Sequence, residues 1–262
     1  MTLYRVALRQ QFASWLVWSI VITLAVGAVS SAAPAVANSQ AVVQLISSLP
    51  ASLRGVMGGA LMIKRPLDGY LYIKLVMYLP LLVGIFTGFQ ASSLFAREME
   101  HRRFDFLLGL PITRRRLLLT RFLALVTAQA AMWVVAIGAL MLFVRQQGFP
   151  VDVAGYVLVG FSGFLVTLVT TSAGLWASTA ARDYAAAARW GLGIATVPFA
   201  YDLAVRVATV APGWRYILPY GYYNPPHLLL THAFPWLETV VLIAATVVLT
   251  LLAIRTFERR EV

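Results

Sequence analysis

The chain has 262 residues, of which 60% are hydrophobic and only 12% are charged, and its mean hydropathy is +0.80. Soluble domains carry about a quarter charged residues, so this composition excludes a soluble globular protein and predicts an all-α integral membrane protein. The net charge of +11 does not indicate nucleic-acid binding, because the arginines flank apolar runs instead of forming one soluble basic face. The chain has no cysteine, which excludes disulfides and thiol chemistry.

The first dozen residues, MTLYRVALRQQF, predict a short helix that lies along the membrane surface before the chain enters the bilayer. Arg5 and Arg9 would share one face of this helix, and apolar residues lead from it towards Trp15. The apolar run that follows is too long for the central region of a cleavable signal peptide. We therefore expect an N-terminal interfacial helix that is retained in the protein.

Six apolar runs are each long enough to cross a hydrocarbon core of about 30 Å, so we expect six transmembrane helices in one domain that covers residues 1–262. The expected spans are about 13–33, 71–95, 122–144, 154–177, 190–211 and 237–254. Within the second span, Pro80, Gly84 and Gly88 indicate a kink or a close contact with another helix.

The distribution of positive charge predicts the orientation. Fourteen of the 21 Lys and Arg lie in the segments on the side of the termini and five lie in the segments on the other side. By the positive-inside rule both termini are cytoplasmic, in a multi-pass protein of the cell membrane.

The second outer segment, residues 212–236, is rich in aromatic residues and proline. Its aromatic side chains predict a belt at the membrane interface, or alternatively a segment that re-enters the membrane as a gate. The residues assigned to the belt are Trp214, Tyr216, Tyr220, Tyr222, Tyr223 and Trp236.

The connection between the second and third spans, residues 96–121, carries seven of the 21 Lys and Arg around a short apolar patch. Phe104, Leu107 and Leu108 share one helical face, and Pro111 limits how far that helix continues. Such a loop can simply fix the orientation and contact anionic headgroups. The apolar patch favours a second interpretation, an amphipathic helix that binds a partner, because a lipid-facing or solvated loop does not need it.

Asp202 and Arg206 lie within the fifth span at a spacing of four residues, in the order that favours a helical ion pair. Charges at membrane depth are costly and usually face the interior of a bundle or a wet cavity. The pair is therefore a candidate for the translocation path or for a subunit contact. The alternative is a self-neutralising pair near the outer interface.

Other chemistry finds little support. Ser162 lies in Gly-Phe-Ser-Gly, which resembles the serine motif of rhomboid proteases, but the sixth span has no histidine to act as its base, since His227 and His232 precede that span. No histidine pair has metal-ligand spacing, so no metal site is predicted. Neither lysine follows the glycine of a nucleotide-binding loop, so any ATP must be bound by another chain and no enzyme activity is expected of this one.

The run EHRRFDFLLGLPITR, residues Glu100–Arg114, resembles the pattern E-x-G-T-x-E-x-L-L-x-x-P-[VI]-[ST]-R of ABC-2 type transporter permeases. The segments LPASLRGVMGG and RPLDGY and the arginine-rich tail also look like those of half-size members, so the resemblance covers essentially the whole chain. Two positions depart from the pattern, because Arg102 occupies the usual glycine and Asp105 stands where glutamate is commoner.

This resemblance implies the transmembrane subunit of an ATP-driven exporter, whose inner loop contains a coupling helix that docks into a groove of a separate ATPase subunit. Phe104, Leu107 and Leu108 would fill the groove, with the acidic residues orienting the loop and the arginines contacting the ATPase or lipid. The residues so implied are Glu100, Phe104, Asp105, Leu107, Leu108, Pro111, Arg114, Arg115 and Arg116. The resemblance also implies a permease dimer, of identical or related chains, with ATP and Mg on the ATPase subunits and no cofactor on this chain.

Two other functions remain open from the residues. An ion-coupled secondary transporter would need a polar group near mid-membrane, for which Asp202 is the candidate. A rhomboid-like intramembrane serine protease would act through Ser162. Nothing in the sequence identifies the cargo.

Overall fold

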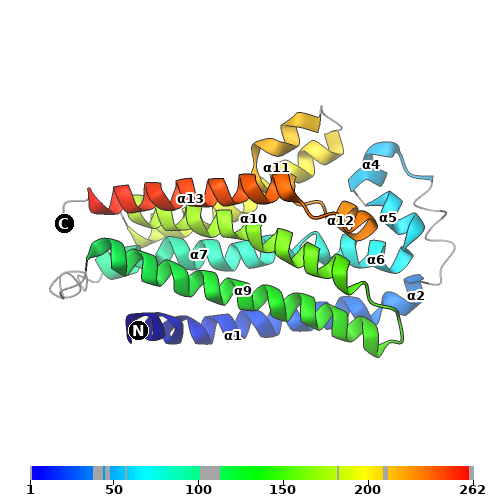
Figure 1. Ribbon diagram of the computed structural model, residues 1–262, viewed down its shortest axis with the longest axis horizontal. Coiled ribbons are helices and arrows are strands. Elements are labelled where there is room, and N and C mark those ends of the chain that lie inside the picture. The colour runs from blue at the N-terminus through cyan, green and yellow to red at the C-terminus, as the bar shows by residue number, and fades with distance from the viewer. Residues whose placement is uncertain are drawn as a thin grey trace.

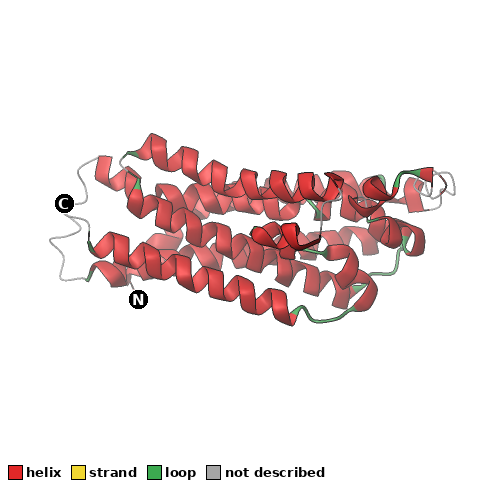
Figure 2. Cartoon of the chain, turned by 90° about the horizontal axis from the view of Figure 1, so that it is seen from above, coloured by secondary structure: helices red, strands yellow, loops and turns green. Residues whose placement is uncertain are grey.

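The computed structural model describes residues 2–37, 44, 48–56, 58–100, 113–181, 183–208 and 212–259. Within these ranges every regular element is helical, which confirms the all-α prediction (Figures 1 and 2). The long helices are α1 (Thr2–Ser31), α7 (Leu79–Glu100), α9 (Arg114–Gln146), α10 (Val153–Ala180), α11 (Tyr184–Ala208) and α13 (Trp236–Glu258). The short ones are α2 (Ala33–Ala37), α4 (Ala51–Val56), α5 (Gly59–Lys64), α6 (Pro66–Leu71), the π-helical η1 (Tyr72–Val76), the 3-10 helices η2 (Pro212–Ile217) and η3 (Pro219–Tyr222), and α12 (Pro225–Thr231).

Six helical stretches of the described chain are long and apolar enough to cross a membrane, as predicted. They are Leu3–Ala35, Pro66–Leu94, Arg115–Gln146, Val153–Ala180, Tyr184–Ala208 and Trp236–Glu258. The start of α1 and the end of α13 lie at the same end of the bundle, and the short helices α4, α5, α6 and α12 gather at the opposite end (Figure 1). The assignment of the termini to the cytoplasm stays a prediction.

Several helices begin before the apolar run that identified them, because polar capping residues set their first turns. The side chain of Thr113 accepts a hydrogen bond from the backbone N–H of Arg116 at the start of α9. Asp152 caps α10 by accepting from the N–H of Gly155 at 3.0 Å. The helices therefore extend past the hydrocarbon region that sequence hydropathy detects.

The predicted N-terminal interfacial helix is continuous with the first span. α1 is one helix of 30 residues, Thr2–Ser31, because the sequence between Arg9 and Trp15 holds no glycine or proline to interrupt it. At 1.5 Å per residue its 30 residues correspond to about 45 Å of helix, more than a hydrocarbon core of about 30 Å. Its first turns stay against α9, where the hydroxyl of Tyr4 lies 2.9 Å from that of Thr127.

Helices α7 and α10 form the centre of the bundle. The apolar windows of the second span, Pro66–Leu94, and of α10 are each 61% buried within the chain, against 17% for the first span and 22% for α11 and α13. α10 packs against α7, α9, α11 and α13, whereas α1 packs mainly against α9. The peripheral helices consequently present large apolar side chains outwards, as expected of a surface that contacts lipid.

Glycines allow α7, α10 and α11 to approach one another closely. A Cβ atom on Gly191 of α11 would lie 2.8 Å from the carbonyl oxygen of Gly88 in α7, and one on Gly174 of α10 would lie 2.9 Å from the same oxygen. These contacts confirm that Gly88 marks a close helix–helix approach. Dispersion contacts between backbones, rather than large side chains, hold this part of the bundle together.

A buried polar network joins α9 to α10. The amide nitrogen of Gln129 donates to the hydroxyl of Thr167 at 2.7 Å, and its amide oxygen accepts from Thr171 at 2.6 Å. The indole N–H of Trp133 donates to the same Thr167 hydroxyl at 3.0 Å. Because each of these groups has a partner, the network fixes the register of the two helices without leaving a polar group unpaired in the membrane.

Candidate functional site

The described members of the predicted coupling set lie where α7 ends and α9 begins. Glu100 is the last residue of α7 and Arg114 the first of α9. Arg115 and Arg116 are exposed in the first turn of α9. The remaining members of the predicted coupling set lie outside the described residues: Phe104, Asp105, Leu107, Leu108 and Pro111.

The first turn of α9 is electrostatically unusual. Three arginines, Arg114, Arg115 and Arg116, occupy the positive end of the helix dipole, and the turn has no acidic residue. A positive side chain there is unfavourable by about 0.3–1 kcal/mol, where an acidic residue would be favourable. Arg115 and Arg116 therefore form an exposed cationic surface that an anionic group would stabilise.

The second predicted pair, Asp202 and Arg206, belongs to a larger buried cluster near the opposite end of the bundle. The Nε of Arg206 donates to one carboxylate oxygen of Asp202 at 2.6 Å, and the Nε of Arg215 in η2 donates to the other at 3.2 Å. Asp202 is only 6% exposed. One carboxylate thus neutralises two guanidinium groups in part, which leaves a net positive charge in the cluster.

Arg206 also ties α11 to the outer segment and to the second span. It donates to the carbonyl of Tyr223 at 3.0 Å, and Tyr223 in turn donates its hydroxyl to the carbonyl of Val76 at 3.1 Å. In a regular α-helix that carbonyl would accept from residue 80, but Pro80 has no N–H. Tyr223 therefore satisfies an acceptor that proline leaves without its helical donor.

Tyr220 makes a similar contact about one turn further along the second span, in α7. Its hydroxyl donates to the carbonyl of Pro80 at 3.0 Å, and a Cβ atom on Gly84 would lie 3.0 Å from that hydroxyl. Gly84 thus provides the room that Tyr220 needs. We call the contacts of Asp202, Arg206, Arg215, Tyr220 and Tyr223 the outer clasp, because they hold residues 212–223 against α11 and the second span.

The outer clasp corrects the predicted aromatic belt. Tyr220 and Tyr223 are 2% and 3% exposed, so they belong to the protein core and not to a belt. Burial raises the pKa of both hydroxyls above the usual tyrosine range, so both remain donors at neutral pH. The exposed aromatic residues Trp214, Tyr216 and Trp236 retain the orientation that a belt requires.

Replacing Tyr223 by phenylalanine should destabilise the fold by about 1–3 kcal/mol, because the buried Val76 carbonyl would lose its donor. The adjacent Tyr222→Phe is the matched control, since the half-buried Tyr222 ring packs on Tyr216 and phenylalanine keeps that contact. The thermal unfolding midpoint in detergent measures both. Equal midpoints for the two variants would contradict the role of the Tyr223 hydroxyl.

Arg215 was not among the predicted site residues, and Tyr220 and Tyr223 were assigned to the aromatic belt instead of the clasp. Arg215 is the one Lys or Arg of residues 212–236. A single cation in a segment that follows the carboxylate of Asp202 was the sequence feature that could have predicted their ion pair. The 3-10 geometry of η2 and η3 gives no hydrophobic period that would place these side chains.

A second polar cluster pins the same end of the bundle. Besides capping α10, Asp152 accepts hydrogen bonds from Arg65, which lies between α5 and α6, and from His232 after α12, the latter at 2.7 Å. Burial alone would raise the pKa of the Asp152 carboxyl, but the donors Gly155, His232 and Arg65 outweigh it and hold this pKa below its usual value. Asp152 therefore stays ionised at neutral pH and joins three segments.

Ser162 has no catalytic environment in the described part of the chain. It is 1% exposed within α10, and its hydroxyl has no hydrogen-bond partner there. The neighbouring Gly163 accommodates the ring of Trp133, since a Cβ atom would lie 2.1 Å from it. The Gly-Phe-Ser-Gly sequence accordingly serves helix packing.

Comparison with known families supplies the identity of the chain. The model of the ABC-2 family transporter proteins matches residues 1–262, the whole sequence. No match was found among curated proteins. Together with the six membrane-spanning helices, the family match agrees with the resemblance of residues 100–114. The chain belongs to the ABC-2 family of transporter proteins and is a multi-pass permease component of an ABC transporter in the cell membrane.

Proposed function

We propose that the chain is the membrane subunit of an ATP-driven exporter and that it couples to a separate ATPase subunit through the connection between α7 and α9. The observation that carries this proposal is the family match over residues 1–262. The described residues form a bundle of membrane helices with short connections, and the sequence has no nucleotide-binding loop. ATP and Mg therefore belong to a partner subunit.

The cationic first turn of α9 supports the position of the coupling surface. Arg115 and Arg116 are exposed at a helix end where positive charge is unfavourable. Such local cost is typical of a functional surface that awaits a complementary partner. An acidic rim on the ATPase groove would supply the missing negative charge, while Phe104, Leu107 and Leu108 enter the groove.

Asp202 and Arg206 take a structural role in this proposal. Asp202 is buried and paired with both Arg206 and Arg215, so a cargo molecule or a coupling ion finds no free carboxylate there. Their part in transport is to hold residues 212–223 against α11 and the second span at the outer end of the path. Ion-coupled transport through Asp202 is disfavoured, because both oxygens of its carboxylate already pair with arginines.

The test is co-purification of the ATPase with the tagged chain from its native host. The variants Leu107→Asp and Leu108→Asp should insert normally and lose most of the bound ATPase, because a carboxylate in an apolar groove is strongly unfavourable. Leu53→Asp in α4 is the matched control, since Leu53 is exposed at the opposite end of the bundle.

Quantitative mass spectrometry measures how much of the P-loop subunit co-purifies with each variant. Loss of that subunit from the two loop variants alone supports the proposal. Wild-type levels of the ATPase on both loop variants would overturn the coupling assignment. A wild-type chain that purifies without any P-loop partner across several mild detergents would overturn the exporter proposal itself.

A further inference from the structure

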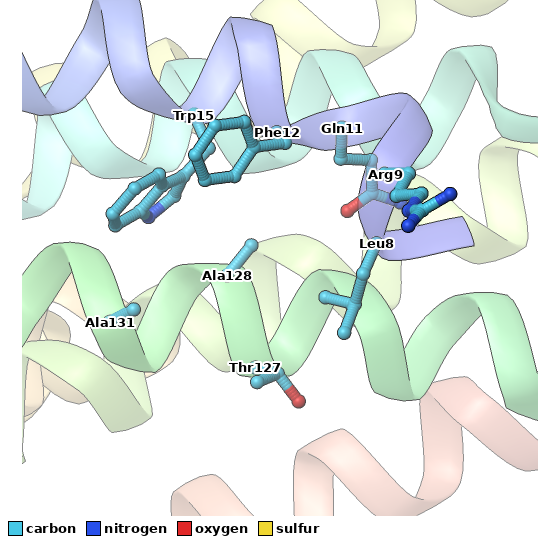
Figure 3. Close-up of a pocket in the computed structure, with 8 residues that line it drawn as sticks. All are labelled: Leu8, Arg9, Gln11, Phe12, Trp15, Thr127, Ala128 and Ala131. Carbon is cyan, nitrogen blue, oxygen red and sulfur yellow. The ribbon is translucent and has the colours of Figure 1, made fainter. Parts of the chain in front are cut away.

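A pocket of about 280 Å³ lies between α1 and α9 near the N-terminus (Figure 3). Its walls are almost entirely apolar, and it exists because α9 presents two small side chains, Ala128 and Ala131, opposite the rings of Phe12 and Trp15. At the wall of the pocket, the hydroxyl of the lining residue Thr127 lies 2.9 Å from that of Tyr4, within hydrogen-bond distance, which fixes the spacing of the two helices. The pocket therefore follows from the choice of side chains on two helices whose spacing is fixed by a contact between them.

One end of the pocket is cationic. Arg9 lines it and is exposed, and Arg5 lies one turn earlier on the same helix. Neither α1 nor α9, the two helices that form the pocket, contains an aspartate or glutamate. The charge of Arg9 is therefore uncompensated by its own walls and favours an anionic group at this end.

Two polar atoms of the pocket lining lack partners within the described chain. They are the amide oxygen of Gln11, a residue only 9% exposed, and the indole nitrogen of Trp15. A buried polar atom without a partner costs about 1–3 kcal/mol. Phe12, the neighbouring wall, is 57% exposed and has room to move aside. A ligand that carries both a donor and an acceptor would relieve this cost on entering.

We propose that the pocket binds one anionic phospholipid, with its phosphate at Arg9, its ester region at Gln11 and Trp15, and an acyl chain along Phe12, Ala128 and Ala131. Arg9 and Trp15 are separated by six residues, or about 9 Å along the helix axis. This order of a cation, then hydrogen-bonding groups, then an apolar wall follows the order of groups in a phospholipid from headgroup to chain. The proposal does not depend on the coupling to an ATPase.

Native mass spectrometry of the full chain in detergent tests the proposal. The delipidated protein is titrated with phosphatidylglycerol, with phosphatidylcholine of identical acyl chains, and with glycerol 3-phosphate as the free headgroup anion. Phosphatidylglycerol should bind more tightly than phosphatidylcholine by about fivefold, the weight of one arginine at an anionic lipid surface. Glycerol 3-phosphate alone should not bind, because the apolar wall contributes only when a chain is present.

Three variants separate the pocket from general charge attraction. Arg9→Gln should reduce phosphatidylglycerol binding to the phosphatidylcholine level, whereas Arg5→Gln removes the same charge one turn away and should leave the preference unchanged. Ala131→Phe fills the pocket and should reduce binding of both lipids, with its thermal unfolding midpoint confirming that the chain is folded.

Equal binding of the two lipids by the wild type would overturn the anion preference. Full lipid binding by a folded Ala131→Phe variant would overturn the site. Binding of glycerol 3-phosphate as tight as that of phosphatidylglycerol would show a plain anion site and overturn the lipid proposal.

Discussion

Replacing Asp202 by asparagine should destabilise the permease by about 3–5 kcal/mol, the cost of breaking a buried ion pair by removing one partner. The asparagine side chain would retain the shape of the aspartate but leave the guanidinium groups of Arg206 and Arg215 without a counter-charge. Asparagine accepts one good hydrogen bond where the carboxylate accepts two charge-assisted ones. The outer clasp should therefore open, and residues 212–223 should lose protection against hydrogen exchange before the bundle unfolds.

Two further variants make this result specific. Arg206→Met should cost less than Asp202→Asn, because Asp202 keeps Arg215 as its partner. Glu258→Gln removes an acidic charge from an exposed position of α13 and should leave the unfolding midpoint unchanged. Thermal unfolding in detergent measures all three. If Asp202→Asn and Glu258→Gln have the same unfolding midpoint, the Asp202 carboxylate does not hold residues 212–223 in place.

The spans were predictable because the membrane leaves the backbone few choices. An apolar run of about 20 residues must satisfy every N–H and C=O internally, so it becomes a helix whatever its neighbours do. The helix ends were not predictable from the same signal. They depend on single capping side chains such as Thr113 and Asp152, which lie outside the apolar runs.

The candidate site was predictable only where its residues are neighbours on one helix. The spacing of Asp202 and Arg206 gave their ion pair directly, and the structure confirms that contact at 2.6 Å. Arg215 and Tyr223 joined the cluster through the folding back of residues 212–223, which is a tertiary event without a periodic pattern. Coupling through the α7–α9 connection stays a prediction.

The sequence predicted that another helix packs closely at Gly88, but it did not predict which helix that is. Gly88 indicated a near approach of another helix, yet nothing in the order of the spans showed that its partner is Gly191 of the fifth span. The identity of the partner depends on the rotation of both helices about their axes, which the surrounding side chains decide together.

Gly191→Ala should destabilise the fold by about 1–3 kcal/mol, although alanine is the better helix former. Its Cβ atom would lie 2.3 Å from the hydroxyl of Ser92 and 2.8 Å from the backbone carbonyl of Gly88. The serine can rotate, but the carbonyl cannot move without shifting α7, so the two helices must separate. Separation weakens every contact along this seam, including the contact of Gly174 with the same carbonyl.

Gly193→Ala is the matched control on the same helix, because a Cβ atom there meets nothing within 4 Å. It carries the same gain in helix propensity without the clash, so it should be neutral or slightly stabilising. The difference between the two unfolding free energies in detergent isolates the steric cost at Gly191 from the propensity effect. If the two alanines have the same effect, α11 moves freely against α7 and the glycine seam does not define the centre of the bundle. A loss at Gly191 alone shows that backbone contact between the second and fifth spans is required for the fold.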